Sequence, residues 1–272
     1  MYITRISASK SDIIDQCGWK YYLKYVEKLD EGLQSPNEDS LNFGSFIHKV
    51  FELGYKEKTS KDLLKLAESE RATYKIPFRD NSRIQSCIEH FIMFNQKLGE
   101  TVSTEWKFEI KLDEKNDITF NGVIDRIIRG TSGGYLVIDY KTSKREKKKK
   151  DLLTDKQLMG YAYAIHKTYN VPYKDIVCAH YYPLTNNFVE VRFTEFQIKG
   201  WMKKEIDKVW RIRKKKKGEF YPTENMFCDW CEFKCSYCPK FSQPQLVEQR
   251  LDEYRQKKKD QSKSDKDPEI IG

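Results

Sequence analysis

Residues 122–142 read GVIDRIIRGTSGGYLVIDYKT and hold two apolar, β-branched runs that each end in charged residues. Each run is typical of a buried strand whose last residues emerge at the edge of a sheet. Gly133 and Gly134 between the runs predict a hairpin turn, which would bring Asp125 and Asp139 side by side. Side chains alternate along a strand, so Lys141 points to the same face as Asp139. The stretch therefore predicts two carboxylates and a lysine in one place.

These three side chains suit the hydrolysis of a phosphodiester bond. Cleavage at neutral pH needs one or two hard divalent cations, held by carboxylate oxygens, to activate a water and stabilise charge on the departing oxygen. Asp125 and Asp139 suit the cation, and Lys141 can orient the water or stabilise the pentacovalent state. The alternative is an ordinary charge pair between Asp139 and Lys141, which is the usual meaning of an isolated Asp-x-Lys. The motifs around it favour the catalytic interpretation.

Further motifs lie on both sides of the two strands. A serine-rich start at residues 7–9 is followed by a cysteine and aromatic residues at 17–22, and Gly44-Ser-Phe-Ile-His48 comes next. Gln157-Leu-Met-Gly-Tyr161 and a cysteine cluster follow the strands. In this order the motifs resemble the PD-(D/E)XK nucleases, specifically the RecB-type branch that includes the CRISPR-associated single-stranded-DNA exonucleases. The resemblance covers residues 7–238.

The resemblance implies a fold and a set of metal ligands. The fold would be α/β, a restriction-endonuclease-like core with a mixed central sheet flanked by helices, an N-terminal helical lobe and a C-terminal cysteine metal clasp. His48 would be the third protein ligand beside Asp125 and Asp139, although a lone histidine in an apolar helix is more often structural. Imidazole with two carboxylates makes Mn²⁺ a plausible activator besides Mg²⁺.

Two further positions follow from the same comparison of motifs. Gln157 and Tyr161 are one helical turn apart, so they share a face that can look into the site and touch the phosphate. For Tyr161, packing is the alternative. Glu109 lies on the strand before Gly122 and matches a glutamate that the family often places there, with a solvent-facing strand residue as the alternative.

The cysteines give a second signal. Four of the seven form Cys228-x-x-Cys231 and Cys235-x-x-Cys238, and such tight spacing without a secretory signal favours metal over disulfides. One interpretation is a zinc knuckle through these four residues, which leaves Cys17 unpaired.

The resemblance implies a different metal group, a [4Fe–4S] cluster with one N-terminal and three C-terminal ligands. Those ligands would be Cys17, Cys228, Cys231 and, as the favoured fourth, Cys238, because iron–sulfur cysteines are often followed by proline. The spacing leaves Cys235 open as the fourth ligand. We favour the cluster over zinc, in a structural role that ties the ends of the nuclease region together.

Composition agrees with a nucleic-acid partner. The chain has 272 residues, with 50 Lys and Arg against 41 Asp and Glu and a net charge of +9, which favours a polyanion. Basic runs at 144–150 and 211–217 can track phosphates, with solvated loop charge as the alternative. We expect DNA that is single-stranded or contains ends. The sequence has no phosphate loop, so a separate helicase or recombination protein is a possible partner.

The pattern of elements predicts one nuclease domain over residues 1–241. Helices are expected at 9–25, 43–55, 60–74, 82–98, 154–169 and 195–216, and strands at 104–112, 118–129, 135–142, 175–183 and 187–193. Residues 1–100 would be mainly helical, 104–193 the catalytic sheet core, and 195–241 a long helix with the cysteine cluster. Residues 242–272 are polar and predict a tail with at most a short helix and then disorder.

No segment resembles a signal peptide, and no apolar run is long enough to span a membrane. We therefore expect an intracellular protein without a membrane partner, cytoplasmic if it is bacterial or viral in a bacterial host.

The expected function is a Mg²⁺- or Mn²⁺-dependent DNA nuclease. We favour an exonuclease on single-stranded DNA ends that serves recombination, repair or replication. An alternative from another class is a non-catalytic DNA-binding or partner-docking module on the same fold, against which the intact carboxylates and lysine argue. A second alternative keeps the enzyme but makes it an endonuclease on branched DNA or RNA.

Overall fold

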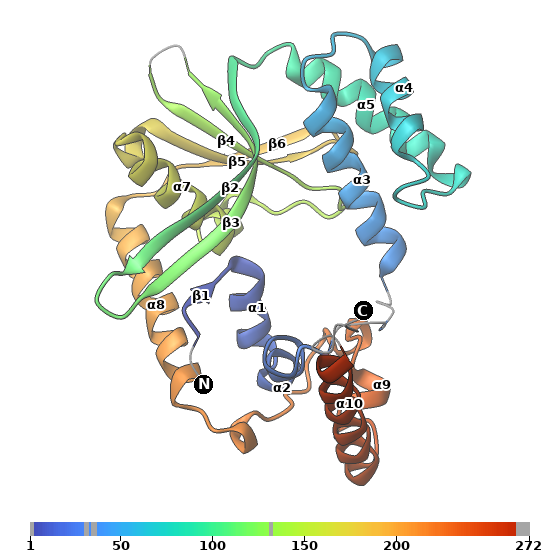
Figure 1. Cartoon of the computed structure of the whole chain (residues 1–272). Coiled ribbons are helices and arrows are strands. Elements are labelled where there is room, and N and C mark those ends of the chain that lie inside the picture. Colours follow the sequence, from blue (N-terminus) through green and yellow to red (C-terminus); the bar gives the residue numbers. More distant parts are fainter. Residues whose placement is uncertain (1–2, 30–32, 34–36, 131–132, 265–272) are drawn as a thin grey trace, which may run out of the picture. The chain divides into compact units, whose positions relative to one another are not determined.

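The computed structural model describes residues 3–29, 33, 37–130 and 133–264. Its contacts divide the chain into two compact units (Figure 1). The sheet unit comprises Met1–Ser11 and Glu38–Lys215, and the cysteine unit comprises Asp12–Asn37 and Lys216–Gly272. Each unit therefore contains residues from two separated parts of the sequence.

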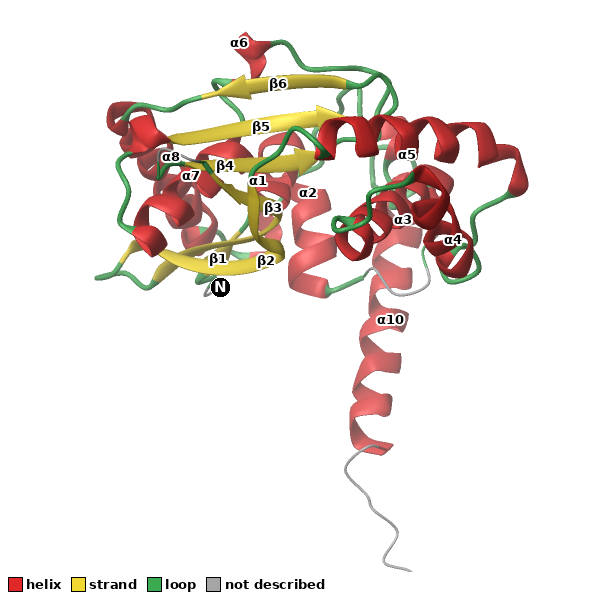
Figure 2. Ribbon diagram, turned by 90° about the horizontal axis from the view of Figure 1, so that it is seen from above, coloured by secondary structure: helices red, strands yellow, loops and turns green. Residues whose placement is uncertain are grey.

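One mixed sheet is the centre of the sheet unit (Figure 2). Its strand order is β1-β3-β4-β5-β6, and β2 also pairs with β3. The pairs β1–β3 and β4–β5 are parallel, whereas β2–β3, β3–β4 and β5–β6 are antiparallel. The strands are β1 Arg5–Ile6, β2 Glu100–Asp113, β3 Ile118–Arg129, β4 Tyr135–Tyr140, β5 Ile176–Tyr182 and β6 Asn187–Val191. The predicted α/β fold with a mixed sheet is confirmed.

Three helices share one hydrophobic core with the sheet. They are α3 Glu38–Gly54, α4 Ser60–Glu70 and α5 Asn81–Asn95. The rings of Phe51 on α3 and Phe91 on α5 stack with centroids 3.9 Å apart, and both meet the edge of Tyr140 on β4. Burial of such large apolar rings is the main stabilising term of this core. It fixes α3, which carries His48, against the end of β4.

Two more helices cover another part of the sheet. Helix α7, Lys156–Tyr169, connects the parallel strands β4 and β5 and lies against both of them and β3. Helix α8, Glu195–Lys214, packs on α7 and β2, and its Trp201 meets Phe120 of β3 edge-on with ring centroids 5.0 Å apart. Gly160 allows α7 to approach closely, because a Cβ there would lie 2.3 Å from the ring of Phe120. A short helix α6, Lys149–Leu152, precedes α7.

The first predicted helix is interrupted in the structure. Instead of one helix over 9–25, the chain forms α1 Ala8–Gln16, α2 Gly18–Tyr21 and a π-helix over Tyr22–Glu27. Cys17 has extended backbone angles, φ −158° and ψ 113°, and its Sγ accepts the amide N–H of Lys20. The side chain of Cys17 therefore caps α2, and this capping conformation ends α1.

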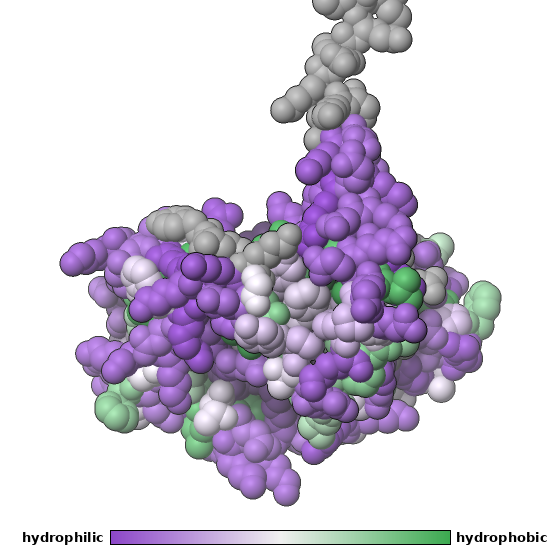
Figure 3. All heavy atoms as spheres, turned by 90° about the horizontal axis from the view of Figure 1, so that it is seen from below, coloured by the Kyte–Doolittle hydropathy of each residue, from purple (hydrophilic) through white to green (hydrophobic). Residues whose placement is uncertain are grey.

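The C-terminal segment also differs from the expected tail. Residues Pro244–Ser264 form helix α10 in the cysteine unit, and residues 265–272 lie outside the described part. Val247 and Leu251 on α10 are buried, the Tyr254 hydroxyl donates to the carbonyl of Lys28, and Arg255 pairs with Glu27 at 2.7 Å. On the face that Figure 3 shows, most of the surface of this helix is hydrophilic, and Leu246 near its start is exposed as well. Among the described residues, no helix combines the length and the apolar character that crossing a membrane requires.

Two short helices lie in the cysteine segment of the cysteine unit. The 3-10 helix Cys228–Trp230 precedes α9, Lys234–Tyr237, and both belong to the predicted cysteine segment. The indole N–H of Trp19 donates to the carbonyl of Tyr237 at 2.7 Å. Lys20 pairs with Glu232 at 2.8 Å. Hydrogen bonds and ion pairs therefore join the N-terminal and C-terminal segments within this unit.

Candidate active site

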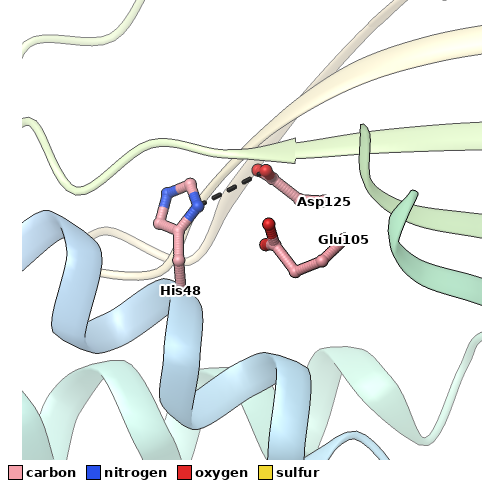
Figure 4. A group of neighbouring side chains, drawn as sticks. All are labelled: His48, Glu105 and Asp125. Carbon is pink, nitrogen blue, oxygen red and sulfur yellow. Dashed lines mark ion pairs between the residues drawn. The ribbon is translucent and has the colours of Figure 1, made fainter. Parts of the chain in front are cut away.

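Three side chains from three elements meet at one point in the sheet unit (Figure 4). His48 comes from α3, Glu105 from β2 and Asp125 from β3, and one ligand atom of each lies within 4.8 Å of the other two. His48 Nδ1 is 3.4 Å from Asp125 Oδ1. The other ring nitrogen, Nε2, is 2.9 Å from the carbonyl oxygen of Tyr140. A proton on Nε2 would be donated to that carbonyl, which leaves the lone pair of Nδ1 for a metal ion.

The backbone of Glu105 is unusual for a strand residue. Its φ is 46°, in the left-handed region, although it lies inside β2. The neighbouring pairs Thr104–Arg126 and Trp106–Ile124 keep the antiparallel register. A non-glycine residue in this conformation costs on the order of 1–3 kcal/mol, and such strain is concentrated at functional sites. The strained residue is the one whose carboxylate lies beside His48 and Asp125 (Figure 4).

The cluster carries more negative charge than its own groups can compensate. Burial and the charge of Asp139 raise the pKa of Asp125, against the opposing effect of His48. Burial, followed by the charge of Asp125, raises the pKa of Glu105 to about 7. Burial disfavours the imidazolium of His48, but Asp125 and its neighbours outweigh it and raise the pKa of His48 to about 9. The neighbouring carboxylates therefore favour the protonated forms of all three groups, and a divalent cation bound here would favour the carboxylates in their ionised form.

Asp139 and Lys141 form an ion pair next to this cluster. Lys141 Nζ lies 2.6 Å from Asp139 Oδ2, and the backbone N–H of Tyr140 between them donates to Asp125 Oδ2 at 2.6 Å. Burial would lower the pKa of Lys141, but the Asp139 carboxylate outweighs burial and raises it. Lys141 is therefore an ammonium ion at neutral pH and acts as a charge and hydrogen-bond donor.

Gln157 and Tyr161 of α7 complete a closed set of contacts with this ion pair. Lys141 Nζ donates to Gln157 Oε1 at 3.0 Å, and Gln157 Nε2 donates to the Tyr161 hydroxyl at 2.7 Å. The Tyr161 hydroxyl donates to the carbonyl of Val123 at 2.5 Å and lies 3.3 Å from Asp139 Oδ1. Tyr161 is only 1% exposed, so its hydroxyl is used inside the protein and positions Gln157 and Asp139.

A close approach between strand and helix makes room for these contacts. A Cβ on Gly122 would lie 2.9 Å from the ring of Phe108 and 3.6 Å from that of Tyr161. Glycine at this position lets both rings pack directly over β3. The Gly-x-x-Asp spacing of the motif therefore has a packing reason at its first residue and a chemical one at its last.

The glutamate of β2 that reaches the site is Glu105, whereas sequence reasoning singled out Glu109. Glu109 lies at the surface, where its carboxylate pairs with Arg5 at 3.2 Å. The two glutamates are four residues apart on the same strand and have similar neighbours in sequence. The sequence offers no signal that distinguishes them, because the choice depends on the register of β2 and on the backbone turn at Glu105.

His180 and Asp155 were also missed. His180 of β5 is fully buried, is in register with Asp139 of β4, and places Nε2 3.6 Å from Asp139 Oδ2. Burial lowers the pKa of His180, so its ring is neutral. Asp155 lies 3.9 Å from the same nitrogen and caps α7 by accepting the N–H groups of Gln157 and Leu158. A polar residue inside the apolar run of β5 was the available signal for His180.

The cysteine unit places four of its cysteines around one pocket. Cys17, Cys228, Cys231 and Cys238 line this pocket, whereas Cys235 is exposed and is not among its lining residues. Backbone N–H groups point at the four sulfurs. The Sγ of Cys17 accepts from Lys20 and Thr223, and that of Cys228 accepts from Asn225, each at 3.4 Å. Burial raises the pKa of Cys231 and Cys238, and backbone N–H groups oppose this at both.

The family model of the PD-(D/E)XK nuclease superfamily matches residues 5–239. The chain belongs to this superfamily. It is therefore a nuclease, a hydrolase that acts on nucleic acid, and the carboxylate and imidazole cluster fits the divalent metal ions that these nucleases use. The recognition made from the motifs is confirmed.

Curated relatives of this nuclease include proteins named for a helicase and a deoxyribonuclease together. The chain is 30% identical over 142 residues to a subunit of the ATP-dependent helicase/deoxyribonuclease of Streptococcus agalactiae serotype Ia. It is 27% identical over 155 residues to the protein of the same name from Streptococcus pyogenes serotype M49. These matches cover 46% and 51% of the chain but only 13% and 14% of the relatives.

A solved structure shares the fold. The crystal structure of an exonuclease candidate from Eubacterium rectale superposes with a TM-score of 0.50, covering 84% of this chain and 87% of that one. Sequence identity is 14%. This likeness supports the α/β architecture of the superfamily.

Proposed function

We propose that this nuclease is a Mg²⁺- or Mn²⁺-dependent DNA exonuclease that acts on single-stranded ends in recombination, repair or replication. The observation that carries the proposal is the meeting of His48, Glu105 and Asp125 beside the Asp139–Lys141 pair. The substrate class follows from the relatives, which are named as parts of a helicase/deoxyribonuclease. A binding module would have no reason to keep a strained glutamate and several carboxylates at one point.

The metal ligands would be His48, Asp125 and Asp139, as expected from the sequence, with Glu105 added by the geometry. When bound, a divalent cation here activates a water and stabilises charge on the departing oxygen. Nδ1 of His48 and Oδ1 of Asp125 face each other, while Nε2 and Oδ2 are held by backbone groups. The ring and the carboxylate are thereby oriented before any ion arrives.

Lys141 would orient the attacking water and stabilise the charge that develops on the phosphate. Asp139 keeps its ammonium protonated, and Gln157 holds Nζ from the other side. Tyr161 fixes Gln157 in turn. These donors are placed before the reaction, so little reorganisation is needed in the transition state.

We also propose a [4Fe–4S] cluster held by Cys17, Cys228, Cys231 and Cys238. These four line one pocket and receive backbone N–H groups, as thiolates of such clusters do. Tetrahedral zinc would bring its sulfurs to about 3.8 Å from one another. Among the described cysteines, no three have Sγ atoms that all lie within 4.8 Å of one another. Cys235, which the zinc knuckle needs, is exposed and does not line this pocket, and this supports the cluster over zinc, with a structural role.

A separate helicase or recombination protein is the partner that this proposal favours. The relatives are named for a helicase/deoxyribonuclease, and the sequence of this chain contains no Gly-x-x-x-x-Gly-Lys-Ser/Thr phosphate loop. Unwinding by another protein would supply the single-stranded ends.

The test is degradation of end-labelled linear and circular single-stranded DNA in Mn²⁺ by anaerobically purified protein. Asp125→Ala and Lys141→Ala are assayed in parallel, with thermal unfolding to show that they fold. We expect linear DNA to be degraded by the native protein alone, and circles to survive. Cleavage of circles would favour the endonuclease. If the native protein is folded and binds DNA but cleaves neither substrate in the presence of metal, the non-catalytic DNA-binding or partner-docking module is favoured instead.

A further inference from the structure

A second polar cavity lies in the sheet unit, outside the cluster of metal ligands. Its volume is about 610 Å³. It is formed where α3 and α5 end and β2 begins. The side chains that matter for its chemistry are Tyr55, Lys56, Lys58, Asn95, Thr101 and Arg126.

Arg126 is a buried cation without a counter-ion at this cavity. It is 3% exposed, and its Nε and Nη2 both donate to Thr101 Oγ1, at 3.0 and 2.7 Å. In the described part of the chain, no carboxylate lies within ion-pair distance of it. The guanidinium instead lies 5.5 Å from the ring centre of Tyr55 and 6.0 Å from that of Phe91. A buried charge is costly unless it is paired, so this position calls for an anion.

Two exposed lysines add positive charge at the mouth of the cavity. Lys56 and Lys58 make no ion pair within the described residues, and Lys56 Nζ lies 5.5 Å from the ring centre of Tyr55. The side-chain amide of Asn95 donates a hydrogen bond to the carbonyl of Tyr55 at 2.8 Å and fixes the backbone just before the two lysines. Glu57 is the one acidic residue of the lining, so three cations outnumber it. The cavity therefore combines positive charge with a partly exposed aromatic ring.

The cavity is connected to the catalytic cluster through two elements. Arg126 directly follows Asp125 on β3, so the two side chains leave opposite faces of that strand, and Tyr55 follows His48 by seven residues, just beyond the end of α3. Seven residues are two helical turns, about 10 Å along the axis. That distance corresponds to about three nucleotides of a stacked strand. Between them, Glu52 is neutralised by Lys49 at 2.9 Å.

We propose that this cavity binds a backbone phosphate of the substrate strand, about three nucleotides from the scissile bond. The proposal rests on the DNA nuclease function proposed above. Arg126 with Lys56 and Lys58 pairs with the phosphate, and the ring of Tyr55 is placed to stack on the adjoining base. The contact would guide the strand past His48 and Asp125 and would act only on substrates long enough to reach it.

The test compares Lys56→Gln/Lys58→Gln with a matched control, Lys203→Gln/Lys204→Gln, on the exposed surface of α8. Affinity for a fluorescent single-stranded 20-mer is measured in Ca²⁺ over a range of salt concentrations. Hydrolysis of the small chromogenic ester thymidine 5′-p-nitrophenyl phosphate is measured in Mn²⁺. Arg126→Gln is added, with thermal unfolding to show that it folds.

We expect the Lys56/Lys58 variant to bind the 20-mer about fivefold more weakly or worse. The slope of log K against log salt should fall by up to about 0.7, since the cavity is proposed to bind one phosphate and each phosphate contact on a single strand contributes about 0.7. Hydrolysis of the small ester should be unchanged, and the control should match the native protein. If the Lys56/Lys58 variant hydrolyses the ester and binds DNA with the affinity and salt slope of the native protein, the proposed phosphate subsite is wrong. The proposed nuclease function would be unaffected by that result. Failure of the native protein to hydrolyse the ester or DNA would instead reject the proposed function.

Discussion

Nδ1 of His48 lies 3.4 Å from Oδ1 of Asp125, and the remaining polar atom of each side chain is held by the backbone of Tyr140. One residue at the end of β4 therefore orients the two proposed metal ligands, one from α3 and one from β3. Because Asp139 and Lys141 flank Tyr140 in sequence, the same strand end also supplies the ion pair for which we propose a catalytic role. The backbone of Tyr140 in the Asp-Tyr-Lys motif thus holds His48 and Asp125 in place, while the side chains of the motif supply the carboxylate and the ammonium.

Glu105→Gln is expected to weaken metal binding. The amide keeps the shape of the side chain but removes one of the charges that a cation would balance. The Mn²⁺ concentration for half-maximal activity should rise by about tenfold or more. Glu109→Gln is the matched control on the same strand, and its activity should stay close to that of the native protein. Equal effects of the two substitutions would remove Glu105 from the metal site.

Lys141→Met should lower kcat by about 10²- to 10³-fold with little change in KM, because the ammonium acts on charge that develops in the transition state. Gln157→Leu should have a smaller effect in the same direction, since it removes the group that holds Nζ. Single-turnover cleavage of a labelled strand measures both. Activity of Lys141→Met near the native level would contradict the role of the lysine.

Cys238→Ser and Cys235→Ser distinguish the two sets of metal ligands. Iron and sulfide content and the brown absorption of anaerobically purified protein are the measurements. We expect Cys238→Ser to lose the cluster and Cys235→Ser to retain it. Of these two cysteines, Cys238 lines the pocket together with Cys17, and Cys235 does not. Stoichiometric zinc in the native protein, lost in both variants, would show the zinc knuckle instead.

The stability of the metal-free protein should fall as pH rises. The pKa of Glu105 is raised from 4.5 to about 7, and that of His48 from 6.5 to about 9, so the folded state binds protons more tightly than the unfolded chain. For each group the contribution to stability is complete below the pKa of the unfolded chain, 4.5 for Glu105 and 6.5 for His48. It is lost as the pH rises to the pKa of the folded state, so the whole loss falls between about pH 4.5 and 9. Thermal unfolding in EDTA measures it, and Glu105→Gln should flatten the profile between about pH 4.5 and 7. An unchanged profile in that variant would contradict the shift at Glu105.

Strands and long helices were predictable because their sequence patterns are local. The bounds of β3, residues 118–129, match the prediction, and α8 ends two residues before the predicted end. Both segments have an apolar periodicity that agrees with their burial. The contacts of Lys141, Gln157 and Tyr161 also follow the predicted sharing of a face.

The remaining differences depend on contacts between distant parts of the sequence. Glu105 and Glu109 are alike locally, and only pairing with β3 and a positive φ separates them. The break at Cys17 places its sulfur in a pocket with cysteines more than two hundred residues away. In α10 the buried positions Val247 and Leu251 are few among many charges, so the local pattern alone indicates a polar tail.

Anomalous diffraction at the manganese edge from crystals grown with Mn²⁺ tests the central claim most directly. The account predicts a peak within bonding distance of Asp125 Oδ1, His48 Nδ1 and a carboxylate oxygen of Glu105 or Asp139. The peak should be absent in Asp125→Ala crystals of the same form. Manganese bound elsewhere, with His48 still in direct contact with Asp125 at saturating metal, would contradict the account.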